Sequence, residues 1–451
     1  HAAMSVRHAP ILFILTRSDM ENKMGKTQAL FETRKDNPKW NTSYPLHIED
    51  WAPYRVHKAL SFNGVTEMSF YIHIPFCRQI CAFCEYSRIA CPDEQTQKKY
   101  LESLRQDIIS FIQSHDCAFT LTGFDIGGGT PTSLSEENFA YLLDIYDEVM
   151  GMCNKTSDFE PSIEGTFNTL SAHKINRIVS SGIHRLSLGV QSTSGDVLEQ
   201  VNRQNAKIDD MRHWMKTAWD SGIKKINLDL MYGLQRQGAA SIDADLSVLK
   251  ELKPQQVTLY ELRTNMITCK EIPDKSDLYE QYSRYYLGLV SLGYIARFGQ
   301  NTFSIDNSDH GVSSYLRSRM LMGIPYKGFG ISAQSMSPNG VSYNVGKSPS
   351  MTRKALLESS FNEEYTYNLP PFELAAKYIA IAAYNGSFSI QRVSELIGMD
   401  AWEYYKEELK YCLDLGLIYV DNGRAFITNL GFKYYGAVFS LFYAKNSRSD
   451  E

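Results

Sequence analysis

The sequence predicts an α/β fold of parallel strands linked by helices, followed by a smaller α+β domain that resembles a winged helix. Short β-rich runs recur between residues 69 and 263, and amphipathic stretches separate them. Such alternation is typical of parallel strands with helical crossovers. After residue 361 the pattern changes to helices followed by a hairpin.

Six β-rich runs form the first part, and each ends in glycine, polar or charged residues. They are SFYIHIPF (69–76), FTLTGFDIGGG (119–129), FEPSIEGTF (159–167), IHRLSLGVQS (183–192), KKINLDLMYG (224–233) and QQVTLYELR (255–263). In barrels of this type the chemistry lies at the carboxyl ends of the strands. We therefore expect the functional residues where these runs end.

One helix between the second and third runs has a clear pattern. Ser133 and Glu136 have the spacing of a capping box, which predicts that the helix begins at that point. The apolar residues that follow at helical intervals are Phe139, Leu142, Leu143, Tyr146 and Val149. This pattern predicts a surface helix that covers a sheet.

The rest of the chain divides at compositional boundaries. Residues 336–353 are rich in Ser, Pro, Gly and Asn, which indicates a loop or hairpin before a boundary near 360. In the tail we expect helices over 370–386 and 400–416 and a hairpin around the Asp-Asn-Gly of 417–428. The predicted domains are an N-terminal extension (1–65), a partial barrel (66–265), a cap and connecting segment (266–360) and the winged-helix-like domain (361–451).

Composition excludes several classes of function. The net charge is −5 over 451 residues, and residues 371–451 hold eight Lys/Arg against ten Asp/Glu. We therefore expect no nucleic-acid partner. The apolar run APILFILT has eight residues, against the ~20 that span a bilayer, so no membrane association is expected. Eight irregularly spaced cysteines without an export signal favour reduced thiols and a cytoplasmic protein.

Three of the eight cysteines stand close together, just past the first run. Cys77, Cys81 and Cys84 form a CxxxCxxC pattern inside YIHIPFCRQICAFCEYS. Thiolates at this spacing can hold zinc or an iron–sulfur cluster, but zinc normally takes four protein ligands. No second pair follows, and Cys91 is the nearest spare thiol. A cubane held by three cysteines leaves one iron open; zinc and incidental buried cysteines are the alternatives.

The motif resembles that of the radical S-adenosylmethionine (SAM) superfamily. The stretch from Tyr71 to Cys77 resembles the YxHIPFC of the branch built around oxygen-independent coproporphyrinogen III oxidase. The resemblance implies a partial (β/α)6 TIM-like barrel and a [4Fe–4S] cluster on Cys77, Cys81 and Cys84. SAM would bind the open iron and be cleaved to a 5′-deoxyadenosyl radical. A one-electron donor such as flavodoxin or ferredoxin would be a partner.

The same resemblance implies a set of SAM contacts. GGGTPT (127–132) matches the turn beside the SAM amino group, and Gln191 and Arg203 have the spacing of the ribose and carboxylate contacts. Glu164 occupies the position of an acidic SAM contact, although the usual Asn-Pro after it is replaced. The full predicted cofactor set is Tyr71, Phe83, Gly127, Gly128, Gly129, Thr130, Glu164, Gln191, Arg203, Asp229, Met231 and Gln334.

Asp229 also has a significance that depends on no relative. An acid inside the apolar run NLDLMYG is costly to bury unless it is paired or faces a polar cavity. We therefore predict that Asp229 faces the inside of the barrel mouth. A hydrogen-bonded core aspartate is the alternative.

The segment GFGISAQS (328–335), which ends near Gln334, resembles one that helps to bind a second SAM in coproporphyrinogen oxidase. Two departures from the branch matter for the reaction: Tyr86 replaces an extra cysteine of the oxidases, and HGVSSYL at His310 lacks the Asn and Trp of the haem chaperones' HNxxYW. Both suit the class C radical SAM methyltransferases.

The expected function is transfer of a methyl or methylene group from a second SAM to an sp² carbon of a small-molecule or natural-product substrate. Coproporphyrinogen III dehydrogenation, anaerobic haem degradation and haem delivery by a non-enzymatic chaperone are the alternatives.

Overall fold

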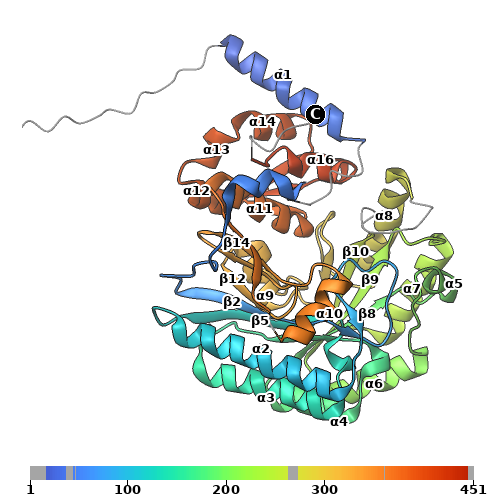
Figure 1. The fold of residues 1–451 in the computed structure, drawn as a ribbon. Helices are drawn as coiled ribbons and strands as arrows, with labels where there is room; N and C mark the ends of the chain where they lie inside the picture. The colour runs from blue at the N-terminus through green and yellow to red at the C-terminus, as the bar shows by residue number, and fades with distance from the viewer. Residues whose placement is uncertain (1–16, 37–43, 46, 263–272, 360, 445–451) are drawn as a thin grey trace, which may run out of the picture.

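A computed structural model describes residues 17–36, 44–45, 47–262, 273–359 and 361–444. The run APILFILT and Cys269 lie outside these residues. Within the described part of the chain, every helix is too short or too polar to cross a bilayer. Figure 1 shows one large sheet with helices beneath it and a helical domain above it.

All six predicted strands are present, and they pair in parallel in the order in which they occur along the chain. They are β2 (Glu67–Ile74), β5 (Thr120–Gly128), β7 (Ser162–Gly165), β8 (Arg185–Gln191), β9 (Lys225–Tyr232) and β10 (Gln256–Glu261). The structure adds a seventh parallel strand, β12 (Tyr326–Phe329), on the free edge of β2. At the other edge, β11 (Thr302–Ser304) pairs with β10 in the antiparallel sense.

The connecting helices pack on one face of this sheet, as Figure 1 shows for α2, α3, α4 and α6. Their bounds are α2 (Glu94–Ser114), α3 (Glu136–Met152), α4 (Ala172–Ser180), α5 (Gly195–Gln200), α6 (Ile208–Ser221), α7 (Ala239–Leu252) and α8 (Lys275–Ser291). Apolar strand residues such as Phe70, Ile126 and Leu228 are buried beneath them. Each such side chain contributes about 1.5–3 kcal/mol to folding.

The predicted capping box of α3 is wrong. The helix begins two residues later, where the Ser135 side chain accepts a hydrogen bond from the Asn138 N–H. Ser133 lies instead in a short 3₁₀ turn, η2 (Pro131–Ser133), and its hydroxyl donates to the Phe76 carbonyl, 3.0 Å away. The spacing rule failed because the Ser133 side chain bonds to Phe76, the residue before Cys77, and is therefore not available to cap the helix.

Polar residues occupy the alternate positions of the parallel strands and face the inside of the partial barrel. Strand pairing places Tyr71 beside Asp125, and Asp229 beside Thr258. Because side chains alternate along a strand, the apolar face meets the helices and the polar face lines the interior. The interior therefore has the character of a binding site.

A second group of strands extends the sheet beyond β12. The expected hairpin over 336–353 is formed by β13 (Gln334–Ser337) and β14 (Gly340–Asn344), and α10 (Pro349–Glu358) follows. β14 pairs with β15 (Glu363–Asn368), which pairs with β1 (Arg55–Val56). Before β12, the chain forms a short helix, α9 (Ser314–Leu316), and a π-helical turn, η5 (Arg317–Met322).

The C-terminal domain contains helices and a small antiparallel sheet. Its elements are α11 (Pro371–Ala382), β16 (Ser387–Ser389), α12 (Ile390–Ile397), α13 (Ala401–Tyr404), α14 (Lys406–Asp414), β17 (Ile418–Asp421), β18 (Arg424–Ile427), α15 (Asn429–Phe432) and α16 (Tyr435–Ser440). The predicted hairpin is present, with Asn422 and Gly423 at positive φ in its turn. The helix predicted over 400–416 is broken at Tyr405. The helix α1 (Arg17–Arg34) lies across this domain (Figure 1).

Candidate functional site

The three motif cysteines lie at the carboxyl end of β2. Cys77 ends the short strand β3 (Phe76–Cys77), which pairs with β4 (Ile89–Ala90), and Cys81 and Cys84 follow in the enclosed loop. None of the three forms a disulfide. Burial raises the pKa of the Cys77 thiol to about 11, although the Thr130 hydroxyl, 3.6 Å from the sulfur, opposes the shift. A bound metal would favour the thiolate by supplying positive charge.

The segment after α5 holds the cysteine loop in place. The Asn202 side chain donates to the Ile80 carbonyl at 2.9 Å. Arg203 Nη1 lies 3.6 Å from Cys81 Sγ, and its Nη2 donates to the Gly189 carbonyl at the end of β8. Arg203 therefore links the cysteine loop to the barrel, a contact that sequence spacing did not predict.

The arrangement of the thiols fits a cluster better than a single ion. Among the described residues, one group has metal-ligand atoms close enough together to hold a single ion. It consists of His115, Asp116 and Cys117 and includes none of the motif cysteines. The three motif sulfurs do not all lie within 4.8 Å of one another, yet they are near enough to interact electrostatically. A cubane separates its ligand sulfurs more widely than one zinc ion does. Three thiols without a fourth suit a [4Fe–4S] cluster with one open iron.

The glycine turn packs closely against the strand that precedes the cysteines. The N–H groups of Gly129 and Thr130 donate to carbonyls of Ile74 and Phe76, both at 2.8 Å. The Gly128 N–H donates to Glu164 Oε2 at 3.1 Å. These N–H groups are therefore bonded within the protein, and the glycines instead permit close packing.

Gly127 keeps the space beside Glu164 open. A Cβ at Gly127 would lie 2.5 Å from the Glu164 carboxylate. The absence of a side chain therefore lets that carboxylate sit against the turn.

Three carboxylates converge inside the barrel. Burial raises the pKa of Glu164 to about 8, with further contributions from Asp229 and Asp125. Burial likewise raises the pKa of Asp125 to about 7. Asp229 accepts hydrogen bonds from Ser187 at 3.1 Å and Asn227 at 2.8 Å. Asp229 therefore faces the interior of the barrel and is also hydrogen-bonded. The predicted position and the alternative of a hydrogen-bonded aspartate both describe it.

Gln191 combines an unusual backbone conformation with a buried side-chain oxygen that makes no hydrogen bond to the described residues. It has a φ of 68° at the end of β8, a conformation that few non-glycine residues adopt. Its Oε1 is buried and accepts no hydrogen bond from the described residues. A buried acceptor without a partner fits a ligand hydroxyl.

Two further predicted residues share an apolar cluster. Met231 is buried, and Phe83 and Tyr260 pack against the cluster that contains it. This cluster lies beside the cysteine loop because Phe83 immediately precedes Cys84. It supplies a hydrophobic wall to the site.

Tyr71 and Gln334 lie on the β12 side of the mouth. The Tyr71 ring stacks on Tyr315 with centroids 5.6 Å apart, and its hydroxyl is 3.4 Å from His73 Nδ1. Gln334 contacts Arg319 and Tyr343 at 3.4 and 3.5 Å. No hydrogen bond joins Gln334 to the cysteine loop in the described chain.

Sequence reasoning missed Asp125, Tyr260, Tyr315 and Arg319. Asp125 could have been found, because it interrupts an apolar strand run just as Asp229 does.

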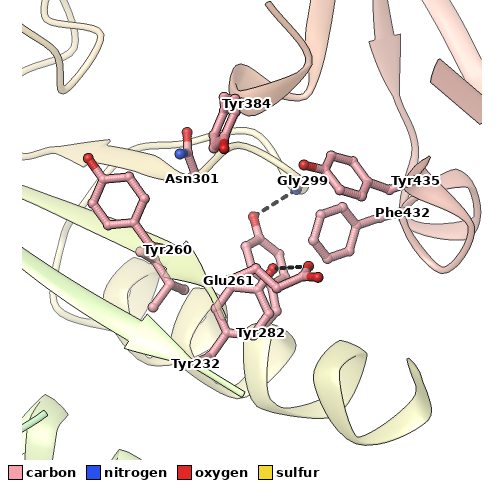
Figure 2. Close-up of a pocket in the computed structure, with 10 residues that line it drawn as sticks. Tyr232, Tyr260, Glu261, Tyr282, Gly299, Asn301, Tyr384, Phe432 and Tyr435 are labelled. Atoms are coloured by element: carbon pink, nitrogen blue, oxygen red, sulfur yellow. Dashed lines mark hydrogen bonds between the residues drawn. The ribbon is translucent and has the colours of Figure 1, made fainter. Parts of the chain in front are cut away.

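An aromatic cleft adjoins the site where the barrel meets the C-terminal domain (Figure 2). Its barrel side includes Tyr260 and Glu261 of β10, and its other side includes Phe432 and Tyr435. The Tyr232 hydroxyl donates a hydrogen bond to Glu261 Oε2 at 3.0 Å, which is drawn as a dashed line in Figure 2. Tyr260 therefore lies between this cleft and the apolar wall of the cysteine site.

Comparison with known proteins agrees with this geometry. The model of the radical SAM superfamily matches residues 71–246, a span that contains the cysteine loop, the glycine turn, four of the six predicted strands and most of the first. The chain therefore carries a radical SAM domain.

Its relatives belong to the coproporphyrinogen III oxidase-like branch. The haem chaperone HemW of Bacillus subtilis is 28% identical over 381 residues, which cover 83% of this chain and 98% of the relative. The oxygen-independent coproporphyrinogen III oxidase of Escherichia coli is 26% identical over 276 residues, or 59% of this chain and 58% of that enzyme.

A solved structure of the E. coli coproporphyrinogen III oxidase HemN, described as a radical SAM enzyme, has the same fold. It superposes with a TM-score of 0.71 at 22% identity and covers 90% of this chain and 97% of that one.

Proposed function

We propose that this protein is a radical SAM enzyme whose Cys77, Cys81 and Cys84 hold a [4Fe–4S] cluster with one open iron. The observation that carries the proposal is the convergence of these three thiols with a polar barrel interior at one edge of the sheet. When bound, the cluster and SAM supply a one-electron cleavage that yields methionine and a 5′-deoxyadenosyl radical.

The chain's own residues would bind and orient SAM. The Glu164 carboxylate, held against the glycine turn, suits an ammonium group. The unpartnered Gln191 Oε1 suits a ribose hydroxyl, and Asp229 stands among further acceptors one strand away. The Arg203 guanidinium suits a carboxylate, and the wall containing Met231 and Phe83 would exclude water.

The proposal also concerns the reaction that the 5′-deoxyadenosyl radical then carries out. Methyl transfer from a second SAM rests on the GFGISAQS segment, whereas the relatives named above are haem chaperones and coproporphyrinogen oxidases. Oxidation of a propionate-bearing tetrapyrrole is therefore an equal candidate. A small-molecule substrate would enter at the aromatic cleft, and flavodoxin or ferredoxin would supply the electron.

Haem delivery is a second candidate function. One observation favours it: the B. subtilis haem chaperone matches this chain over 98% of its own length. Such a role requires haem binding but no SAM turnover.

One experiment separates these functions. The reconstituted, reduced protein is given SAM with a deuterated methyl group, together with coproporphyrinogen III, and a second sample is titrated with haem. Methyl transfer would yield S-adenosylhomocysteine and deuterated 5′-deoxyadenosine, whereas oxidative decarboxylation would yield carbon dioxide and unlabelled 5′-deoxyadenosine. Tight haem binding without any 5′-deoxyadenosine would overturn the proposed enzyme in favour of the chaperone.

A further inference from the structure

One guanidinium at the barrel mouth has no acidic partner. Arg319 lies in the π-helical turn η5, and π-turns often occur at functional sites. No described carboxylate lies within 4 Å of its nitrogens. Its neighbour Arg317, by contrast, pairs with Asp158 at 2.6 Å. A partly buried cation without a counter-charge is costly, so the position requires an explanation.

The hydrogen bonds of Arg319 leave much of its donor capacity unused. Nη1 donates to the Tyr315 hydroxyl at 3.3 Å, and Nη2 donates to Gln334 Oε1 at 3.4 Å. Nε is buried and makes no hydrogen bond to any described residue. A guanidinium has five N–H groups arranged as a planar fork that fits a carboxylate.

The surroundings of Arg319 are aromatic. Its Cζ lies 4.5 Å from the centroid of the Tyr326 ring, which fixes the plane of the guanidinium. The Tyr326 hydroxyl is also buried, and the polar group that it meets is the Arg319 guanidinium itself. Among the described residues Arg319 therefore has neutral phenol and amide neighbours and a buried Nε without an acceptor, which suits an anionic ligand group.

Arg319 lies at the same end of the barrel as the cysteine loop. Tyr315, to which it donates, stacks on Tyr71 of β2. The phenol of Tyr86, two residues past Cys84, interacts electrostatically with Arg319. The guanidinium therefore lies across the mouth from the cysteines, beside Gln334.

We infer that Arg319, with Tyr326 and Gln334, binds the carboxylate of a ligand held over the cysteine loop. This inference rests on the proposed function, because it assigns the ligand to the same reaction. The carboxylate belongs either to the substrate or to the methionine part of a second SAM.

The test measures binding rather than turnover. Coproporphyrin III and its tetramethyl ester differ in their carboxylates, and their affinities are measured from quenching of protein fluorescence. SAM stoichiometry is measured by anaerobic equilibrium dialysis of the reconstituted protein. The variants are Arg319→Gln and Arg319→Lys, with Arg317→Gln as the matched control two residues away.

If the substrate supplies the carboxylate, the wild type should prefer the free acid to the ester at least tenfold. Arg319→Gln should remove that preference and leave SAM stoichiometry unchanged. If a second SAM supplies it, Arg319→Gln should bind one SAM fewer than the wild type. Arg319→Lys, which keeps the charge but loses the fork, should show an intermediate loss, and Arg317→Gln should match the wild type.

The inference is overturned if Arg319→Gln keeps both the relative affinity of the wild type for free acid and ester and its SAM stoichiometry. Should Arg319→Gln fail to fold, the same two measurements on Arg319→Lys decide the question. Failure of the proposed function would appear separately, as a wild-type protein that makes no 5′-deoxyadenosine.

Discussion

Replacing Glu164 by Gln should stabilise the iron-free protein at alkaline pH. The folded-state pKa of Glu164 is raised from its usual 4.5 to about 8, first by burial and then by Asp229 and Asp125. A raised acid pKa means that the folded state binds the proton more tightly than the unfolded chain. The destabilisation is therefore absent below pH 4.5, grows as the pH rises and is complete above about pH 8.

The size of the effect follows from the same shift. A change from 4.5 to about 8, at 1.36 kcal/mol per pKa unit, corresponds to about 5 kcal/mol at most above pH 8. Gln cannot ionise, yet its carbonyl can still accept from the Gly128 N–H. We expect the melting temperature of Glu164→Gln to match the wild type near pH 5 and to exceed it by about 5–10 °C at pH 8.5.

Thermal unfolding followed by circular dichroism from pH 5 to 9 measures this difference. Glu137→Gln, on the exposed face of α3, is the control and should follow the wild type at every pH. SAM affinity should fall in Glu164→Gln, since the ammonium would lose its counter-charge. Parallel pH profiles for wild type and Glu164→Gln would refute the buried, charge-coupled carboxylate.

Three further predictions concern Cys91, Arg203 and the close approach of β5 to α9. Cys91→Ser should keep about four iron atoms per chain, because three thiols suffice for the cluster; iron analysis that shows loss would make Cys91 a fourth ligand. Arg203→Ala should lower both iron retention and 5′-deoxyadenosine yield, since Arg203 contacts Cys81 Sγ at 3.6 Å, and unchanged values for both would remove it from the site. Gly123→Ala should destabilise the protein by about 1–3 kcal/mol, because the new Cβ would lie 2.2 Å from the Tyr315 backbone nitrogen, and unchanged chemical denaturation would contradict this close approach.

Local patterns in the sequence were sufficient for the barrel strands. Each of the six runs alternates apolar residues that meet helices with residues that face the interior, and each is present. The cost of burying an unpaired acid in an apolar run predicted that Asp229 faces inward. The cysteine motif could also be recognised directly, because its residues stand close together in the chain, and its resemblance to the superfamily then implied the partial barrel.

Contacts between distant segments could not be predicted in this way. β12 joins β2, about 250 residues earlier, through backbone pairing that leaves no local signal. Arg319 reaches the mouth only because Gly123 lets α9 pass close to β5. The failed capping box had the same cause, since Phe76 engages Ser133 from another part of the chain.

The central claim is that three cysteines hold a cluster that cleaves SAM, and one measurement tests it most directly. Wild type and Cys81→Ala are reconstituted anaerobically with iron and sulfide, reduced and given SAM, and iron and 5′-deoxyadenosine are quantified in each. We predict about four iron atoms and measurable 5′-deoxyadenosine in the wild type, and loss of both in Cys81→Ala. Full iron content in Cys81→Ala, or a wild type that binds iron but makes no 5′-deoxyadenosine, would contradict the claim.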